Sequence, residues 1–292
     1  MWRWRGCAAS SRMASAKTEP GPPILSRRHI TGFSNPTVKF LRSLREKKLR
    51  RREERFLAEG LRLLTDARES GILPEMLVMA TGREEHPLLA RLEADVAAAG
   101  GDIVEMDEAI LAKVTGKDNP QAVCGVFAEF DTSLARLDRA AAPIWLVAQA
   151  MRDPGNLGTM LRTGDAVGAG GVILIDDCAD PFSVETVRAS MGAIFTQQIA
   201  QARWPEFLDW LRAGEGQLVA ASLRDAQPYR GAPYAAPCFI MVGNESRGLP
   251  EDYEMACDLR VTMPMLGRAD SLNAAVAAAV LAYEALATLR GA

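Results

Sequence analysis

Residues 144–176 read IWLVAQAMRDPGNLGTMLRTGDAVGAGGVILID, and this stretch decides the architecture of the C-terminal half. Two apolar runs, IWLVAQ and GVILID, flank a turn and a helical stretch that begins after Asp153. Neither run alternates apolar with polar residues, which is typical of strands covered on both faces, as in a parallel sheet. A strand, a helix and a second such strand predict the repeating unit of an α/β fold.

Three more apolar runs follow this unit, separated by helical stretches. They are QLVAAS, CFIMVG and LRVTMP, at residues 217–222, 238–243 and 259–264. An alanine-rich helical stretch then runs from Ala274 towards the end of the chain. The pattern predicts one α/β domain with a parallel sheet over residues 144–292.

The N-terminal half has its own alternation of helices and strands. A helical stripe of apolar residues, ended by Gly71, is formed by Val38, Leu41, Leu44, Leu49, Phe56, Leu57, Leu61 and Leu64. Strands are predicted at PEMLVMA, GDIVEMD and AVCGVFAEF, with helices at HPLLARLEADVAAAG and DEAILAKVTG. These elements predict a smaller α/β domain over residues 31–130, joined to the C-terminal domain by a connection at residues 131–143.

The first 30 residues mix Arg, Ser, Ala and Pro without periodicity, so we expect a disordered basic tail. The segment MWRWRGCAASSRMASAK contains no acidic residue and is compatible with a mitochondrial presequence. Met13 offers an alternative start, which leaves residues 1–12 outside the mature protein. We favour a bacterial protein of the cytoplasm, because the five cysteines show no disulfide or zinc spacing. No metal and no membrane are expected, since no apolar run reaches membrane-spanning length.

The charge is unevenly distributed along the chain. Residues 1–60 carry 15 Lys or Arg and 5 Asp or Glu, a net +10, whereas the whole chain carries −3. A basic segment on an acidic body indicates contact with a polyanion such as RNA, and a solvated helix face is the alternative. The candidate phosphate contacts are Lys39, Arg42, Lys47, Lys48, Arg50, Arg51 and Arg52.

Three loops that follow predicted strands carry the candidate chemistry, because ligands of parallel α/β sheets bind at the carboxyl ends of the strands. The first, at residues 153–168, presents backbone N–H groups and Asn156 at a helix start, with Arg162 further along. A capped helix with a surface arginine is the alternative explanation. The second, MVGNESRGLP, holds Glu245 between Gly243 and Gly248, an arrangement that an ordinary polar loop also uses.

The third loop begins at Met263 and leads into the last helix. Ser271 is predicted to cap that helix, with Asn273 in its first turn. Close packing explains the alanines that follow, but it does not explain two polar residues at the helix entrance. The chain lacks a phosphate-binding P-loop and a dinucleotide fingerprint, and its two histidines make a Ser-His-Asp hydrolase improbable.

Together and in this order, the loops resemble the SpoU (TrmH-type) branch of the SPOUT RNA methyltransferases. Its three motifs are similar to DPGNLGTMLRTGDAVG, VGNESRGL and MPMLGRADSLNAAVAAAVLAYE. The N-terminal half is similar to the family's substrate-binding domain through NPTVKFLRSLREKKLRRREERFLAEG and KDNPQAV. The resemblance implies a ribosomal-protein-like α/β/α N-terminal domain and a C-terminal domain tied into a trefoil knot, which forms a homodimer.

The resemblance also implies a reaction, the transfer of a methyl group from S-adenosylmethionine to a ribose 2′-hydroxyl of RNA. It places catalytic roles on Asn156, Arg162, Glu245, Ser271 and Asn273. It places the cofactor near Gly243, Met263, Leu272, Ser222, Leu223 and Gly248. The dedicated N-terminal domain favours ribosomal RNA of the 23S type over transfer RNA.

Each catalytic position then has an expected role. Asn156 would orient the ribose or Arg162, and Arg162 would hold the phosphate beside the target hydroxyl. Arginine stays protonated, so we expect Arg162 to polarise the hydroxyl or recruit a phosphate as proton acceptor, rather than to act as the base. Glu245 would anchor its loop or Asn156, while Ser271 and Asn273 would shape the nucleotide pocket.

Two other functions stay open at this point. One is a catalytically silent RNA-binding factor of ribosome assembly on the same fold, which the intact set of catalytic positions argues against. The other is a small-molecule nucleotide enzyme with an open α/β sheet, which leaves the basic segment without a purpose.

Overall fold

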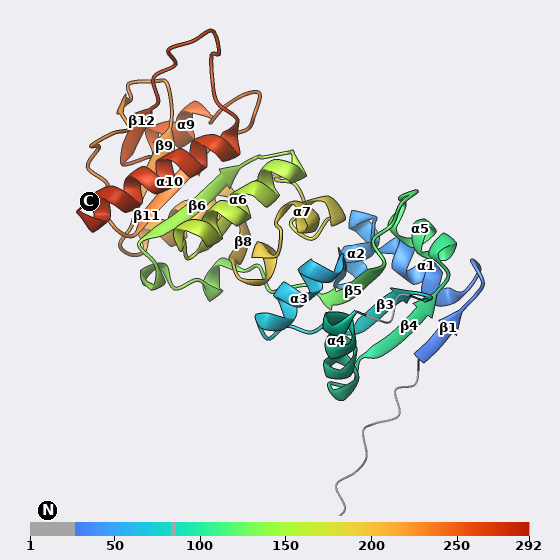
Figure 1. Ribbon diagram of the computed structural model, residues 1–292. Helices are drawn as coiled ribbons and strands as arrows, with labels where there is room; N and C mark the ends of the chain where they lie inside the picture. The colour runs from blue at the N-terminus through green and yellow to red at the C-terminus, as the bar shows by residue number, and fades with distance from the viewer. Residues whose placement is uncertain (1–26, 83–85, 292) are drawn as a thin grey trace, which may run out of the picture.

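The protein consists of two α/β lobes, one for each half of the chain (Figure 1). The structure, a computed structural model, describes residues 27–82 and 86–291. The N-terminal lobe is built on a five-stranded sheet and the C-terminal lobe on a seven-stranded sheet. Within these described residues, no helix has the length and apolar character needed to cross a membrane.

The C-terminal sheet is parallel throughout, as the apolar runs predicted. Its strands, from one edge to the other, are β10 (Gln227–Pro228), β12 (Leu259–Thr262), β9 (Gln217–Ala221), β11 (Cys238–Val242), β6 (Ile144–Gln149), β7 (Gly171–Ile175) and β8 (Gln198–Ala202). The five predicted strands are all present. The pattern missed β8 and β10, because β8 has the polar sequence QIAQA at one sheet edge and β10 has only two residues.

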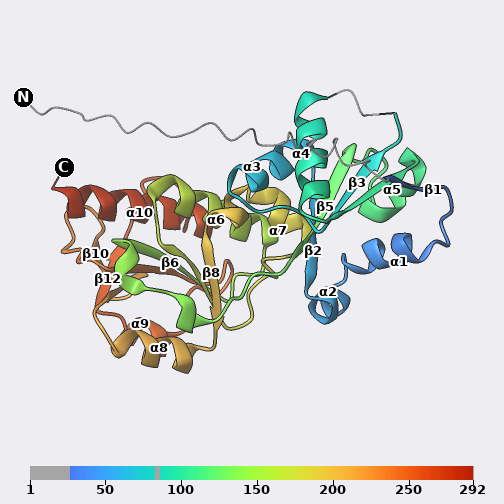
Figure 2. The ribbon, with the colours of Figure 1, turned by 90° about the horizontal axis from the view of Figure 1, so that it is seen from below.

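Helices cover both faces of this sheet (Figure 2). Residues Ile144 and Leu146 of β6 belong to the core shared with α6 (Pro154–Val167) and α10 (Ala274–Arg290). The alternate residues Trp145 and Val147 pack with α8 (Trp204–Arg212), and α9 (Glu251–Met255) lies on the same side as α8. Burial of both faces explains why the strand sequences are continuously apolar.

Helix α6 approaches its neighbour α7 (Val184–Ala189) very closely. A Cβ atom added at Gly158 would lie 2.4 Å from the Cβ of Ala189, so only glycine fits at this contact. Asp153 caps α6 through its side chain, Pro154 occupies the first turn, and Gly168 ends the helix with φ +67°. The local sequence therefore fixes both ends of α6 and its distance from α7.

The N-terminal sheet is mixed. Its strand order is β1 (Arg27–Ile30), β4 (Asp102–Met106), β3 (Met76–Ala80), β5 (Val123–Ala128) and β2 (Arg55–Glu59), and β5 runs antiparallel to β3 and β2. The helices of this lobe are α1 (Pro36–Ser43), α2 (Lys47–Glu53), α3 (Leu61–Glu69), α4 (Pro87–Ala98) and α5 (Glu108–Thr115). The predicted strands and helices after residue 71 are confirmed.

Two predictions for this lobe were wrong. Arg27–Ile30, assigned to the disordered tail, forms β1 and pairs in parallel with β4, where Arg27 also forms an ion pair with Glu93. The helical stripe is not one helix, because Phe56 and Leu57 lie on β2. Glu54, at φ +52°, ends α2, and both faces of β2 are buried, so the strand carries apolar residues without alternation. The rest of the predicted tail, residues 1–26, lies outside the described residues.

The two lobes share an aromatic core. Phe56 and Phe127 of the N-terminal sheet pack against Phe182 and Phe195 of the C-terminal lobe, with ring centroids 4.9–6.2 Å apart. The connection at residues 131–143 contains two short 3-10 turns, η1 (Leu134–Arg136) and η2 (Arg139–Ala141). A third, η3 (Ala193–Phe195), presents Phe195 to this core. Beside this core, Arg50 of α2 pairs with Asp180 in the loop after β7, so α2 lies next to a strand end of the C-terminal lobe.

Candidate active site

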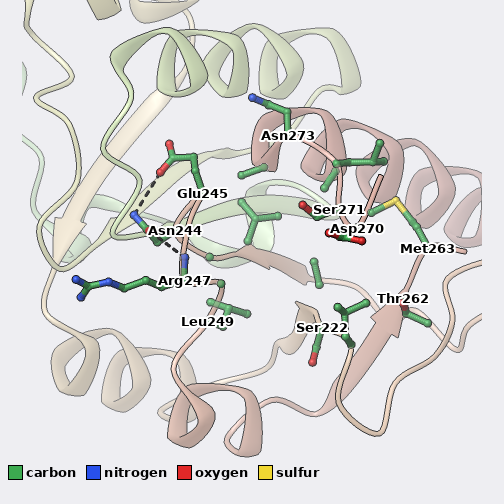
Figure 3. Close-up of a pocket in the computed structure, with 18 of the residues that line it drawn as sticks. Ser222, Asn244, Glu245, Arg247, Leu249, Thr262, Met263, Asp270, Ser271 and Asn273 are labelled. Carbon is green, nitrogen blue, oxygen red and sulfur yellow. Dashed lines mark hydrogen bonds between the residues drawn. The ribbon is translucent and has the colours of Figure 1, made fainter. Parts of the chain in front are cut away.

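A cavity of about 570 Å³ opens at the carboxyl ends of β9, β11 and β12 (Figure 3). Its wall is made by the loops after these strands and by the start of α10. Most of the predicted site residues line it: Ser222, Leu223, Gly243, Glu245, Gly248, Met263, Ser271, Leu272 and Asn273. Two of the three predicted loops, those after β11 and β12, therefore meet in one pocket, and the loop after β9 completes its wall. The predicted loop at residues 153–168 lies outside the lining.

Glu245 is the centre of a hydrogen-bond network on the rim of this cavity. Its carboxylate accepts hydrogen bonds from the side-chain amide of Asn156 at 3.0 Å and from the backbone amides of Arg152 and Asp153, both at 3.3 Å. The expected contact between Glu245 and Asn156 is thus present. Asn244 adds a further hydrogen bond at 3.3 Å from the same loop, drawn in Figure 3.

This environment keeps Glu245 ionised. Burial raises the pKa of the carboxyl, but the hydrogen bonds from Asn156 and from the backbone amides of Glu245, Arg152 and Asp153 outweigh it, so the pKa lies below its usual value. Because its lone pairs are engaged and its pKa is low, this carboxylate is a poor proton acceptor. The Glu245 carboxylate instead holds Asn156 and the backbone at residues 152–153 in place.

Asn156, in the first loop, forms hydrogen bonds with residues of both other loops. While its amide N–H donates to Glu245, its carbonyl oxygen accepts a hydrogen bond of 2.8 Å from the side chain of Asn273. Asn273 is the N-cap of α10, accepting from the amides of Ala275 and Val276. We refer to Asn156, Glu245 and Asn273 as the polar network.

The predicted cap of α10 was therefore wrong by two residues. Asn273 (φ −52°, ψ 137°) accepts the hydrogen bonds of the helix amides with its own side chain, and Ser271 lies exposed in the preceding loop. Ser271 lines the cavity, and its hydroxyl forms no hydrogen bond with the residues that the structure describes. Its position allows contact with a bound ligand.

Arg162 lies on α6, beyond Asn156 and outside the cavity lining. Its side chain is exposed, and none of the hydrogen bonds or ion pairs among the described residues involves it. An exposed guanidinium with its five N–H donors available is suited to a phosphate group. The structure does not place Arg162 in contact with Asn156, whose hydrogen bonds go to Glu245 and Asn273.

Backbone hydrogen bonds within the loop after β11 fix its conformation. Asn244 and Gly248 form an antiparallel bridge, and Gly248 adopts φ +68°. A Cβ atom on Gly243 would lie 2.3 Å from the backbone carbon of Gly248, so this turn requires glycine there. Asn244 also donates 2.8 Å to the Ala150 carbonyl and accepts from the amides at 246 and 247.

Sequence reasoning missed three participants in this site. The backbone amides of Arg152 and Asp153 donate hydrogen bonds to Glu245. Residue type does not reveal such a role, because every residue except proline has a backbone N–H group. Asn244 fastens its loop to the end of β6, and its place next to Glu245 was the available signal. Asp153 does carry a signal, since its turn position predicts the helix cap that it forms.

The predicted RNA contacts divide into two groups. Six side chains on and beside α1 and α2 are exposed: Lys39, Arg42, Lys47, Lys48, Arg51 and Arg52. We refer to these six as the basic surface. The prediction for Arg50 was wrong, because its side chain is only 2% exposed. Arg50 points inward from α2 and bonds to the Leu44 carbonyl and to Asp180, so it is not available to RNA in this conformation.

Comparisons with known proteins agree with this arrangement. The profile of the SpoU rRNA methylase family matches residues 143–283, and that of the MRM3-like substrate binding domain matches residues 35–125. The 23S rRNA (guanosine(2553)-2'-O)-methyltransferase of Bacillus subtilis is 33% identical, over 88% of this chain and 98% of that protein. The 23S rRNA (uridine(2479)-2'-O)-methyltransferase of Streptomyces viridochromogenes is 28% identical, over 94% and 96% of the two chains.

Solved structures show the same fold. The AdoMet-bound rRNA methyltransferase of Sinorhizobium meliloti superposes with a TM-score of 0.84 at 38% identity, covering 90% of this chain and 98% of that one. The SpoU methyltransferase AviRb of Streptomyces viridochromogenes, in complex with AdoMet, gives a TM-score of 0.77 at 26% identity, covering 88% and 98%. Both likenesses extend over the two lobes.

Proposed function

The chain belongs to the SpoU rRNA methylase family, and from this premise we propose that it transfers the methyl group of S-adenosylmethionine to a ribose 2′-hydroxyl of ribosomal RNA. The observation that carries the proposal is the polar network of Asn156, Glu245 and Asn273 beside the cavity. The network ties together the three loops that would surround the reacting atoms.

The cavity fits the cofactor in size and in chemistry. Its floor includes the apolar side chains of Leu249, Met263 and Leu272, and its wall near Gly243 exposes backbone in place of a side chain. These features suit an adenine ring held by apolar contacts and backbone groups. We assign the cofactor contacts to Gly243, Met263 and Leu272, with Ser222, Leu223 and Gly248 at the edge of the same cavity. The cofactor supplies an electrophilic methyl group on a sulfonium, which is a ready leaving group.

The main task of the protein is then to position the RNA. Alignment of two reactants contributes about 7–11 kcal/mol to a reaction of this kind, whereas a general base contributes about 3–5 kcal/mol. Arg162 binds the phosphate next to the target ribose through its planar fork of N–H donors. The permanent charge of Arg162 lowers the cost of removing the hydroxyl proton, and the proton goes to a phosphate oxygen or to solvent.

The polar network fixes the surface against which the ribose lies. Glu245 stays anionic and holds the turn at residues 152–153, which begins the helix that carries Arg162. Asn156 and Asn273 hold the start of α10 to the start of α6. Ser271, exposed at the cavity, contacts the target nucleotide.

The basic surface supplies affinity for RNA without a sequence code. Its six cations are exposed on the outside of α1 and α2, where they can follow a phosphate backbone. Binding should therefore weaken as the salt concentration rises. An affinity that does not depend on salt would remove the basic surface from the RNA-binding site.

The exposed face of α10 supports a homodimer through the C-terminal lobe. Val276 and Tyr283 are 45% and 54% exposed. Tyr229 and Val280 line two hollows, and Tyr283 lines one of these. A second copy seated here would lie beside the cofactor cavity, because one hollow shares Met263 and Leu272 with it. Sedimentation equilibrium of the whole protein tests the homodimer: a monomer at micromolar concentration would contradict it.

The proposed function also includes a trefoil knot in the C-terminal lobe and a cytoplasmic location.

Ribosomal RNA is favoured over transfer RNA, because relatives that align with both lobes are named for 23S rRNA. The test is methyl transfer by the whole protein with tritiated S-adenosylmethionine, offered either ribosomal RNA or transfer RNA that lacks 2′-O-methyl groups. We expect label in ribosomal RNA. Label in transfer RNA alone would show that transfer RNA is the substrate. Binding of both cofactor and RNA without methyl transfer would support a catalytically silent assembly factor.

A further inference from the structure

Arg50 is a buried charge that binds across the two lobes. Its guanidinium donates a 2.7 Å hydrogen bond to the Leu44 carbonyl and a 2.6 Å hydrogen bond to the carboxylate of Asp180 in the C-terminal lobe. The two side chains of this ion pair are 2% and 11% exposed. Burial of a charge pair is costly and adds little stability over an apolar pair of the same shape, so the pair invites an explanation other than stability.

Asp180 lies in the loop after β7, and its contacts make this loop rigid. Its second carboxylate oxygen accepts from the amide of Phe182, and its backbone carbonyl accepts from the hydroxyl of Thr186. The neighbouring residue, Ala179, donates its amide to the carbonyl of Met151 at 2.7 Å. The ion pair therefore connects α2 to the loop after β6.

Met151 immediately precedes the two amides that hold the active-site carboxylate. Arg152 and Asp153 donate their N–H groups to Glu245, which in turn accepts from Asn156. An unbroken path of hydrogen bonds and adjacent residues thus runs from a buried side chain of the RNA-binding lobe to the polar network. Lys47, Lys48 and Arg51, which belong to the basic surface, stand on the same short helix as Arg50.

We propose that Arg50 is a positioning residue for methyl transfer: through Asp180 it fixes the turn at residues 151–153 and thereby the orientation of Glu245 and Asn156. The inference rests on the proposed function. It makes α2 a helix with two faces, an exposed one that binds RNA phosphates and a buried one that holds the catalytic turn. RNA bound to the exposed face is then held in a fixed register with the reacting atoms.

The test compares three variants of the whole protein. Arg50→Met replaces the charge by a shorter, unbranched apolar side chain, whereas Arg50→Lys keeps the charge but loses the planar fork of N–H donors. In the double variant Arg50→Met with Asp180→Asn, both charges of the pair are absent, so no uncompensated ion is left in the interior. The double variant keeps the test valid if Arg50→Met alone fails to fold.

The matched control is an ion pair within the N-terminal lobe, between the partly exposed Lys117 and the buried Glu59. Lys117 pairs with Glu59, whose side chain is 1% exposed, and neither residue contacts the path to Glu245. Lys117→Met therefore reproduces the loss of one partner of an ion pair without touching the catalytic turn. Its folded fraction, checked by circular dichroism, sets the baseline for effects that come from stability alone.

We expect kcat at saturating RNA to fall by about 10- to 100-fold in Arg50→Met and in the double variant, the loss that a misplacement of about 1 Å produces. Arg50→Lys should retain an intermediate rate. The dissociation constant for RNA should change by less than about threefold, because the basic surface is intact. Hydrogen exchange followed by mass spectrometry should show faster exchange of the amides at residues 151–156 in the Arg50 variants and unchanged exchange in Lys117→Met.

Two results would overturn the inference. One is a folded Arg50→Met or double variant with the kcat of the unmodified protein, and the other is unchanged exchange of the amides at residues 151–156. Failure of the proposed function looks different, since the unmodified protein would then transfer no methyl group to RNA. The exchange measurement needs no activity and decides the role of Arg50 in either case.

Discussion

The polar network and the basic surface perform two kinds of recognition with opposite designs. In the network, three side chains from three loops share hydrogen bonds of 2.8–3.0 Å, so each one depends on the others. On the basic surface, six exposed cations lie along α1 and α2, and among residues 27–82 and 86–291 only Arg52 of the six forms an ion pair, with its neighbour Glu53. Single substitutions therefore matter more in the network, because a shared network fails as a unit whereas dispersed charges act nearly additively.

The largest effect is expected at Arg162. Arg162→Ala removes the fork that binds the phosphate beside the target hydroxyl, and kcat/KM should fall by about 10³-fold, as for the loss of one preorganised charge-stabilising group. Arg162→Lys should recover little, because one ammonium cannot replace a bidentate contact. Steady-state methyl transfer measures both.

Arg91→Ala is the control for Arg162, since Arg91 is an exposed arginine on α4, far along the chain from the site. We expect no change in its rate. If Arg162→Lys turned over normally with a shifted pH optimum, the permanently charged, bidentate role of Arg162 would be wrong.

A smaller loss is expected inside the network. Glu245→Gln replaces an anion that accepts from two backbone amides by a neutral amide that can accept with only one oxygen. The catalytic turn loosens, and kcat should fall by about 10- to 100-fold. Glu69→Gln, an exposed change at the end of α3, provides the control in the same assay.

The pH dependence of the rate provides a second test of the role of Glu245. Because its pKa lies below 4.5, the hydrogen bonds that the anion accepts contribute stability that is present above the unfolded pKa and is lost as the pH falls through the folded pKa. The rate should therefore show no ionisation of Glu245 between pH 5 and 9. A pH profile with a carboxyl group titrating near neutrality in the unmodified protein, absent in Glu245→Gln, would make Glu245 a base.

The basic surface should respond in affinity more than in rate. Changing Lys47, Lys48 and Arg51 together to alanine removes three phosphate contacts, so the slope of log K against log salt should decrease by about 2 for single-stranded RNA. KM rises while kcat changes little. Binding titrations at several salt concentrations measure the slope, and an unchanged slope would show that RNA takes another path.

The smallest effect concerns Glu129, which lies near the buried pair of Arg50 and Asp180. Burial, reinforced by the charge of Asp180, raises the pKa of Glu129 to about 6. A carboxyl group with a raised pKa costs stability once it ionises, so the cost is present above about pH 6 and is relieved as the pH falls towards the unfolded pKa of 4.5.

Glu129→Gln should therefore stabilise the protein at pH 8, by about 1 kcal/mol or less after allowance for solvent screening of this partly exposed group. At pH 4.5 the variant and the unmodified protein should unfold at the same temperature. Thermal unfolding at the two pH values measures the difference, and an equal gain at both would exclude ionisation of Glu129 as its cause.

Sequence patterns predicted the C-terminal lobe better than the N-terminal lobe, for a physical reason. Strands such as β6 and β11 are buried on both faces, and their continuous apolar runs are bounded by turn residues. The stretch from Asn35 to Gly71 contains helix and strand in quick succession, and the apolar residues of β2 continue the helical spacing by chance. Only the left-handed turn at Glu54 separates them, and glutamate gives no sign of it.

The site was predictable where a side chain performs the task and unpredictable where burial or backbone does. Glu245, Asn156 and Asn273 stand out as polar residues at strand ends. Arg50 and Arg51 lie on the same helix, and they differ in the direction of their side chains. The side chain of Arg50 points towards the other lobe, which a charge pattern cannot predict. Almost every residue type has a backbone amide like those of Arg152 and Asp153, so their role is visible only in the folded structure.

The most direct test of the central claim is the position of the transferred methyl group. The whole protein is incubated with labelled S-adenosylmethionine and ribosomal RNA, the RNA is digested to nucleosides, and the labelled nucleoside is identified by mass spectrometry. We predict label on the ribose 2′-oxygen of one type of nucleoside, formed about 10³-fold more slowly by Arg162→Ala. Label on a base, or an unchanged rate of transfer by Arg162→Ala, would contradict ribose 2′-O-methylation guided by Arg162.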